Sequence, residues 1–536
     1  MNVVFYGSLL SSLCLLSACQ PQLPQTLAEG LVYCAEGSPE SFNPQHVTSG
    51  TTIDIVSQQL YDRLLDINPQ SGELEAALAE RWRVSEDGRT YWFELKQQVQ
   101  FHHTGYFSPS RPLQAADVVF TFERILDTHH PYHPIGGGDY PYFESVDLRS
   151  LVTAVTAETP LTVRFDLSRP DSSFLSNLAT DFASILSAEY AAQLLQQHQP
   201  ELLDSQPVGT GPFMFRDYKK DQFVRYYRHP EYWGGKAQLS QLVFDLVPDS
   251  AKRMAMLLTH ECDVVAYPRH AELKLVTERP DVEVQSQISM NVGFWAFNTQ
   301  KAPFNNAKVR KALAMAIDRN TILQAVYFGH ADLARSVLPP TSWAFDNNAE
   351  ELPYQPELAK QLLAEAGYPK GFQMDIWAMP VQRLYNPNAQ KMAELMQADL
   401  ARIGVRARIV SLEWNSFRRK LSDNEHDSVL IGWSADNADP DNFFRPLLSC
   451  AAAQNGSNRA NWCDPKFDNL LNQALLTADP QQRRSFYLAA QHYLAEQMPL
   501  FSIAHSKRFQ AQSVKVSGVV MSPYGGVSMA KAEKDL

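Results

Sequence analysis

This sequence of 536 residues lacks several features that mark large classes of protein. Beyond the N-terminus it has no apolar run approaching 18 residues, so no membrane-spanning helix is predicted there. It has 47 Lys and Arg against 59 Asp and Glu. The resulting net charge of −12 argues against nucleic acid or an anionic membrane surface as a partner. Internal repeats and low-complexity tracts are also missing.

Catalytic and metal-binding motifs are missing too. The sequence has no G-x-S-x-G, no H-E-x-x-H and no cysteine in a catalytic context, so a hydrolase is disfavoured and we expect no enzyme activity. His129, His130 and His133 lie among prolines in a loop, and His102 is followed by His103. Either group could bind a metal ion, but Pro131 and Pro134 interrupt the first group, and we predict no metal and no cofactor.

What is present predicts a large folded protein. The length corresponds to roughly 3.6 domains of about 150 residues each. Hydrophobic residues make up 45% of the chain and charged residues 20%, which suits extensive cores and excludes a disordered protein.

The N-terminus carries an export signal. Residues 1–18 are apolar and uncharged, and Leu16-Ser-Ala-Cys19 resembles a bacterial lipobox, in which the cysteine is lipidated. An ordinary secretory peptide is the alternative, and no Lys or Arg precedes the apolar run. We predict a signal peptide at 1–19, lipidation of Cys19, and a polar tether at 20–29. The predicted location is the periplasm or the extracytoplasmic face of a bacterial membrane.

Four cysteines follow the signal: Cys34, Cys262, Cys450 and Cys463. An even number in an exported protein predicts two disulfides, with three pairings open. Zinc is the rival interpretation, disfavoured because no C-x-x-C accompanies these residues.

The first half of the chain has mixed patterns. Arg81–Lys96 predicts a hairpin around an Asp-Gly turn, and Ala115–Leu126 predicts a helix with one apolar face. Residues 127–145 are rich in Pro, His and Gly, which predicts a long loop. Pro207–Pro212 (PVGTGP) predicts a rigid turn and lacks the Lys-Ser/Thr of a phosphate loop.

The second half predicts an α/β lobe. Strands at 372–379, 405–410 and 427–433 alternate with a helix at 388–403, which favours parallel pairing. Ligands of such sheets bind at the carboxyl ends of the strands. Two polar segments lie there, 380–385 with an arginine and 434–439 with paired acids, and together they would suit a zwitterion.

Several segments resemble the bacterial extracellular solute-binding proteins of the peptide/nickel type, family 5. They are Leu31–Pro44, Thr48–Thr52, Leu78–Trp82, Asp117–Phe122, Pro207–Phe213, Tyr232–Lys236 and Val309–Asp318. Met379–Asn388 and Gly432–Phe444 are most similar to dipeptide receptors of this family, and Sap-type peptide receptors are near relatives. The resemblance runs from about residue 31 to 526.

The resemblance implies an α/β, two-lobed periplasmic-binding-protein fold of type II, of the large peptide-binding cluster. An additional α+β domain is inserted, and a hinged crevice holds the ligand. The implied ranges are 30–60, 208–289 and 506–536 for lobe I, 61–207 for the inserted domain, and 290–505 for lobe II. It also implies the disulfides Cys34–Cys262 and Cys450–Cys463.

The resemblance further implies how a ligand is held. Asp436 would bind the ammonium of a peptide and Arg383 its terminal carboxylate. The other implied ligand-binding residues are Tyr385, Gly50, Thr48, Ser49 and Trp433. Asp439 and Asp441 we assign to a turn.

The function implied is the substrate-binding component of an ABC importer that delivers di- and oligopeptides to membrane permease subunits. A Sap-type receptor for antimicrobial peptides, or a receptor for haem, is the alternative within the family, and a peptide hydrolase is the alternative from another class. We expect a monomer whose contact with the membrane is made through an N-terminal lipid.

Overall fold

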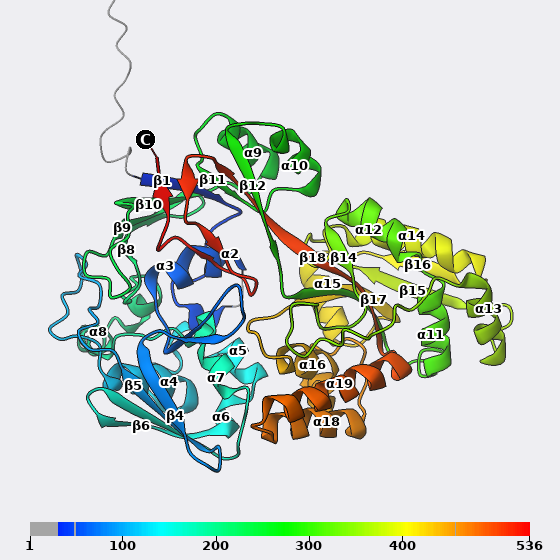
Figure 1. The fold of residues 1–536 in the computed structure, drawn as a ribbon, viewed down its shortest axis with the longest axis horizontal. Coiled ribbons are helices and arrows are strands. Elements are labelled where there is room, and N and C mark those ends of the chain that lie inside the picture. Colours follow the sequence, from blue (N-terminus) through cyan, green and yellow to red (C-terminus); the bar gives the residue numbers. More distant parts are fainter. Residues whose placement is uncertain (1–29, 48–49, 456, 536) are drawn as a thin grey trace, which may run out of the picture.

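The computed structural model describes residues 30–47, 50–455 and 457–535. The predicted signal peptide and tether lie outside these residues, as do Cys19, Thr48 and Ser49. The described chain forms two lobes side by side, with a smaller unit beneath the first (Figure 1). A long strand, β18 (Leu500–Ser513), crosses from one lobe to the other.

Lobe I contains strands from distant parts of the chain. Strand β1 is parallel to β10 and β11, whereas β8, β9 and β10 pair antiparallel. Its strands are β1 (Gly30–Ala35), β8 (Phe213–Lys219), β9 (Phe223–Arg228), β10 (Gln241–Leu246), β11 (Val264–Ala266) and β12 (Val282–Ile288). Its helices include α2 (Gly50–Thr52), α3 (Gln58–Leu60), α9 (Ser250–Leu258) and α10 (His270–Thr277).

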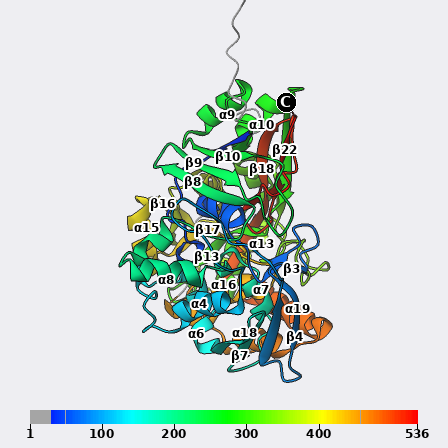
Figure 2. The same cartoon turned by 90° about the vertical axis from the view of Figure 1, so that its left-hand side faces the viewer.

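The elements between α3 and β8 form the smaller unit, below the β8–β10 strands in Figure 2. An antiparallel sheet of order β4-β5-β7-β6 forms one layer. Its strands are β4 (Ala79–Val84), β5 (Thr90–Leu95), β6 (Val152–Thr159) and β7 (Thr162–Leu167). The predicted hairpin at 81–96 is confirmed as β4 and β5. Gly88 has a φ of +67°, which glycine adopts without strain.

Helices cover this sheet. The helix predicted at 115–126 is confirmed as α4 (Ala115–Leu126). The loop predicted at 127–145 is wrong in part, since it ends in α5 (Pro141–Ser145), which is too short for a repeating apolar pattern. The other helices are α6 (Leu148–Leu151), α7 (Phe174–Leu178) and α8 (Ala188–Gln196).

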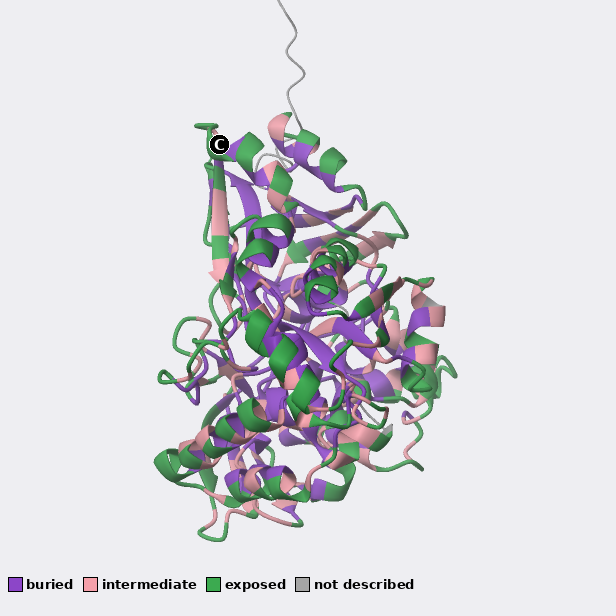
Figure 3. Cartoon of the chain, turned by 90° about the vertical axis from the view of Figure 1, so that its right-hand side faces the viewer, coloured by how far each residue is buried: buried purple, intermediate pink, exposed green. Residues whose placement is uncertain are grey.

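Lobe II contains the predicted α/β pattern. Strand β15 (Gln373–Ala378) is parallel to β16 (Arg406–Val410) and to β17 (Ser428–Ser434), and α14 (Ala389–Arg402) connects β15 with β16. The sheet is mixed, because β13 (Asn291–Phe297) pairs antiparallel with β17 and β18. Strand β13 is buried along its whole length, and helices at the surface of the molecule expose their outer faces (Figure 3).

The remaining helices of lobe II flank this sheet. They are α11 (Ala307–Met315), α12 (Arg319–Tyr327), α13 (Pro356–Glu365), α15 (Trp414–Ser422), α16 (Asp441–Leu448), α17 (Cys450–Asn455), α18 (Pro465–Leu476) and α19 (Pro480–Gln497). Within the described ranges, no helix is both long and apolar enough to cross a membrane.

The crossing strand β18 pairs with strands of both lobes. Its first part pairs with β13 and with β14 (Ala331–Leu333), and from Lys507 onward it pairs with β11 and β12. The predicted boundary between lobe II and the C-terminal part of lobe I, at 505/506, falls inside this strand. Cys34 is bonded to Cys262 and Cys450 to Cys463, the pairing that the resemblance implies.

The predicted turn at 207–212 packs against the backbone of the last two residues of α3. A Cβ on Gly211 would lie 2.6 Å from the carbonyl carbon of Leu60 and 2.8 Å from the carbonyl oxygen of Gln59. Because backbone cannot move aside cheaply, Gly211→Ala is expected to destabilise the protein by about 1–3 kcal/mol in urea unfolding. Gly105→Ala is the control, since nothing lies within 4 Å of its added Cβ. Equal stability of the two variants would contradict this packing.

Candidate functional site

The candidate site begins where two adjacent parallel strands end. Strand β15 ends at Ala378, and the loop after it carries Arg383 and Tyr385. Strand β17 ends at Ser434, and Asp436 follows. Because β15 and β17 are neighbours in parallel, the two loops leave the sheet on the same edge, as the sequence predicted.

Arg383 is exposed and stands on a small turn. Its backbone N–H donates to the Asn386 carbonyl at 3.1 Å, and the Asn386 N–H donates back at 3.0 Å. Its guanidinium carbon lies 5.3 Å from the ring centre of Trp414, at the start of α15. The guanidinium donates to the Gln382 carbonyl at 3.0 Å, and among the described residues no acidic side chain forms an ion pair with it. Arg383 therefore presents a fixed positive charge at the edge of lobe II.

The charge of Arg383 also acts on lobe I. Burial raises the pKa of Glu36, which directly follows β1, and the positive charges of Arg253 and Arg383 oppose that rise. Glu36 and Arg383 come from different lobes. Arg383 thus lies on the side of lobe II that faces lobe I.

Tyr385 packs on the sheet itself. Its backbone carbonyl accepts a 2.8 Å hydrogen bond from the hydroxyl of Tyr327. Its ring covers Gly432, where no Cβ could fit. Burial raises the pKa of the Tyr385 hydroxyl, and the charge of Arg383 opposes the rise. The phenol is therefore a neutral hydrogen-bonding group beside Arg383.

Asp436 is half-buried and held by one asparagine. Its backbone N–H donates to Asn442 Oδ1 at 3.0 Å, and Asn442 Nδ2 donates to its carboxylate at 3.4 Å. Burial raises the pKa of Asp436 to about 7, the bond from Asn442 opposes this, and the charge of Asp181 adds to it. A carboxylate in this state would gain from a nearby cation.

Trp433 shares the same asparagine. Its indole N–H donates to Asn442 Oδ1 at 3.4 Å, so one side chain positions both Trp433 and Asp436. Sequence reasoning missed Asn442. An asparagine in the first turn of a helix gives no local sign that it holds residues of the preceding loop.

Asp436 also lines a cavity of about 240 Å³ between the two lobes and the smaller unit. Arg63 and Asp181 contribute from the smaller unit, and Tyr524 contributes from the C-terminal segment. Burial raises the pKa of Asp181 to about 6, although Arg63 opposes the rise. Arg63 and Asp181 form an ion pair. Neither was predicted, because only the tertiary fold brings them to Asp436.

Gly50 lies on the lobe I side, at the start of α2. The position of its absent Cβ is 3.8 Å from the hydroxyl of Tyr267. The Tyr267 ring lies 4.7 Å from the guanidinium carbon of Arg508, which is ion-paired with Asp54. Gly50 is therefore placed over a buried charged cluster. Thr48 and Ser49, predicted beside it, lie outside the described residues.

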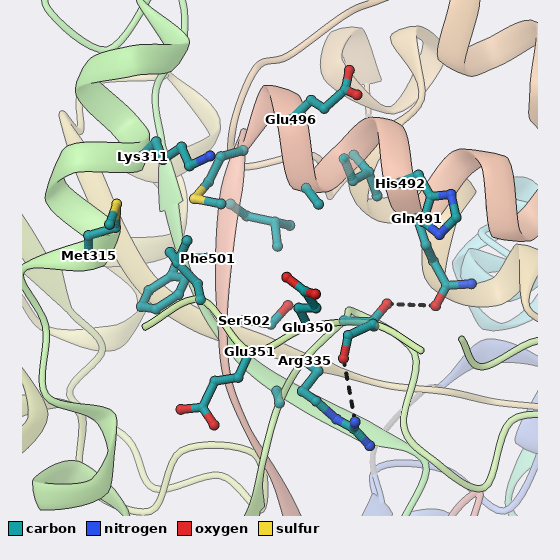
Figure 4. A pocket seen from close by; sticks show the side chains of 18 of the residues that line it. Lys311, Met315, Arg335, Glu350, Glu351, Gln491, His492, Glu496, Phe501 and Ser502 are labelled. Atoms are coloured by element: carbon teal, nitrogen blue, oxygen red, sulfur yellow. Dashed lines mark hydrogen bonds between the residues drawn. The ribbon is translucent and has the colours of Figure 1, made fainter. Parts of the chain in front are cut away.

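A larger cavity, about 900 Å³, lies on the flank of lobe II (Figure 4). Met315 and Phe501 give it an apolar floor, and its rim carries Lys311, Glu350 and Glu351. Because the rim mixes both signs of charge, it has no evident preference for an anion or a cation. None of the predicted ligand-binding residues lines it.

Residues 73–455 match the model of the bacterial extracellular solute-binding proteins, family 5. The chain belongs to this family. The family consists of solute receptors rather than enzymes, in agreement with the missing hydrolase motifs.

Known relatives cover nearly the whole chain. It is 45% identical to a dipeptide-binding protein of Escherichia coli and 44% identical to heme-binding protein A of Haemophilus influenzae. The first alignment covers 93% of both chains, and the second covers 95% of this chain and 93% of the relative.

A solved structure shows the same fold. The dipeptide-binding protein of Pseudoalteromonas sp. SM9913, in complex with Met-Leu, is 51% identical and superposes with a TM-score of 0.85. The match covers 94% of this chain and 100% of that one. The two-lobed α/β fold expected from the sequence is therefore confirmed.

Proposed function

We propose that this protein is the receptor of an ABC importer and captures dipeptides and other short peptides by their charged ends. The observation that carries this is the placement of Asp436 and Arg383 on neighbouring loops at one sheet edge. The relatives named for dipeptide binding support it.

A dipeptide at neutral pH carries an ammonium at one end and a carboxylate at the other. Asp436 accepts charge-assisted hydrogen bonds from the ammonium, which are about twice as strong as neutral ones. Arg383 offers a planar fork to the carboxylate. Two extended residues span about 7 Å, at ~3.3–3.6 Å each, so two fixed anchors measure peptide length.

The remaining residues contact the middle of the ligand. The Tyr385 hydroxyl adds a hydrogen bond near Arg383, and Trp433 forms a wall for a side chain. Gly50, Thr48 and Ser49 offer main-chain groups from lobe I, where the absent side chain of glycine permits close approach. Main-chain contacts bind the peptide backbone whatever its sequence.

Delivery completes the proposed role. The loaded receptor, a monomer, docks on permease subunits of the importer. A lipid on Cys19 holds it at the extracytoplasmic face of the membrane, close to that permease.

Affinity is expected to depend on pH through Asp436. With a pKa of about 7 in the ligand-free protein, this carboxyl is largely protonated at pH 6 and must lose its proton to bind an ammonium. Lowering the pH therefore favours the free form, and affinity should fall up to about tenfold per unit below pH 7. Calorimetric titrations of a dipeptide at pH 5.5, 6.5 and 7.5 measure this.

The control for the pH experiment is Asp436→Asn, which removes the titrating group at nearly constant shape. Its weaker affinity should change less across the three pH values than that of the wild type, because Asp181, whose pKa burial raises to about 6, still titrates in the same cavity. Equal wild-type affinities at pH 5.5 and 7.5 would show that Asp436 does not bind the ammonium.

A competition panel tests the proposed function itself. The protein is unfolded and refolded to remove carried-over ligand, then titrated with a dipeptide, a tetrapeptide and haem. Tight binding of the dipeptide supports the proposal. Preference for haem or for the longer peptide would instead favour a haem receptor or a Sap-type receptor.

A further inference from the structure

The loop that carries Asp436 continues directly into the smaller unit. The next residue, Asn437, is buried, with 1% of its surface exposed. Its side-chain amide donates to the Tyr142 hydroxyl at 3.0 Å and to Asn177 Oδ1 at 3.1 Å. Tyr142 lies on α5 and Asn177 on α7, so both acceptors belong to the smaller unit. Asn437 therefore joins lobe II to that unit beside the proposed ammonium anchor.

The acceptors are fixed by contacts within the smaller unit. The Tyr142 ring stacks on Phe182 with centroids 4.5 Å apart. The Tyr142 hydroxyl donates to Asn177 Oδ1 at 2.9 Å, and Asn177 Nδ2 donates to Ser173 Oγ at 3.3 Å. This receiving surface is thus organised without any contribution from lobe II.

The donor is fixed by contacts within lobe II. Asn437 Oδ1 accepts the backbone N–H of Asp439 at 2.9 Å. Asp439 forms a buried ion pair with Arg483 of α19, at 2.7 Å. Besides being the turn residue predicted from the sequence, Asp439 thus anchors the loop to lobe II. The amide of Asn437 is left pointing out of lobe II with its two donors.

We infer that Asn437 is a latch: its amide, bonded to Tyr142 and Asn177, holds the lobes closed and keeps Asp436 against the ligand. This rests on the proposed function. When lobe II moves away, both bonds break together, and Asp436 moves with Asn437 because they are adjacent. Closure of the lobes and binding of the ammonium are therefore coupled, because the two residues responsible are adjacent in one loop.

A second contact also joins the smaller unit to lobe II, and its contribution to closure must be distinguished from that of Asn437. Ser172 of the smaller unit donates its N–H to the Leu475 carbonyl at 2.9 Å and its hydroxyl to the Thr477 carbonyl at 2.7 Å. The carbonyl groups of lobe II remain in any side-chain variant. Loss of Asn437 alone should therefore shift closure without abolishing it.

The test is a double-mutant cycle of Asn437→Ala, Asn177→Ala and the double variant, titrated with Met-Leu. Each single variant should bind about 5- to 100-fold more weakly, the range expected for losing one or two hydrogen bonds. The double variant should bind scarcely more weakly than the weaker single variant, because both remove the same contact. The control is Asn305→Ala, an exposed asparagine of lobe II, which should leave the affinity unchanged.

A distance measurement separates a latch from a merely structural role. Spin labels at exposed Glu80 of β4 and Glu357 of α13 report the separation of the two bodies by pulsed dipolar spectroscopy. Asn437→Ala should lower the closed fraction at subsaturating Met-Leu, and so should Asn177→Ala, which breaks the contact between the two bodies but keeps the bond from the Asp439 N–H to Asn437 Oδ1. Additive losses in the double variant, or an unchanged closed fraction, would overturn the inference.

The two proposals can fail separately. If the wild type does not bind Met-Leu but its ligand-free form is partly closed, the proposed function fails. The effect of Asn437→Ala on that closed fraction then tests the latch by itself: a lower closed fraction supports it, and an unchanged one overturns it. A wild-type protein that never closes would overturn the latch directly.

Discussion

Replacing Asp436 by alanine is expected to weaken dipeptide binding by about 2–5 kcal/mol. The variant leaves the ligand's ammonium in the closed crevice without its partner. The high pKa of Asp436 in the ligand-free protein points the same way, since this carboxyl lacks a compensating cation until a ligand arrives. Isothermal titration calorimetry with a free dipeptide measures the loss.

Asp423→Ala is the matched control for this experiment. Asp423 is an exposed aspartate just beyond α15, on the same lobe. Its removal changes the net charge equally and should leave the affinity within about twofold, since exposed charges at a distance are screened. Affinity unchanged in Asp436→Ala would remove this residue from the site.

Replacing Arg508 by methionine is expected to destabilise the protein by about 3–5 kcal/mol, because it leaves Asp54 buried and unpaired. Both side chains are 3% exposed. Arg508 donates to the two oxygens of Asp54 at 2.9 and 3.0 Å, and to the Gly526 carbonyl at 2.8 Å. It thereby connects β18 to the segment that follows Gly50 in the chain. Urea unfolding measures the cost.

Two further variants make this prediction specific. Adding Asp54→Leu to Arg508→Met removes the unpaired charge and should recover part of the stability. Arg81→Met breaks an ion pair whose side chains are 73% and 49% exposed, and should cost about 1 kcal/mol or less. If Arg508→Met cost no more stability than Arg81→Met, the buried pair of Arg508 and Asp54 would not support the site.

The fold was predicted best where the local pattern was strong. Helix α4 has the predicted ends, and β15, α14, β16 and β17 lie within one or two residues of their predictions, because each has a clear apolar period. The antiparallel pairing of β13 and β18 was not predicted, since partners about 200 residues apart leave no local mark.

The residues of the candidate site likewise divide into those that the sequence could predict and those that it could not. Arg383 and Asp436 could be proposed because each follows a strand whose carboxyl end the pattern located. Asn442, Asp181 and Asn437 could not, because each acquires its role from a residue in another element or unit. A turn-forming sequence such as DNADPD gives no sign of which of its side chains faces a neighbouring unit.

The most direct test of the central claim compares Met-Leu with N-acetyl-Met-Leu in calorimetric titrations of the refolded protein. The two ligands differ only at the amino end, where acetylation removes the charge that Asp436 is proposed to bind. We predict that acetylation weakens binding by about 100-fold or more. Equal affinity for the two ligands would show that the crevice does not recognise the peptide by its charged end.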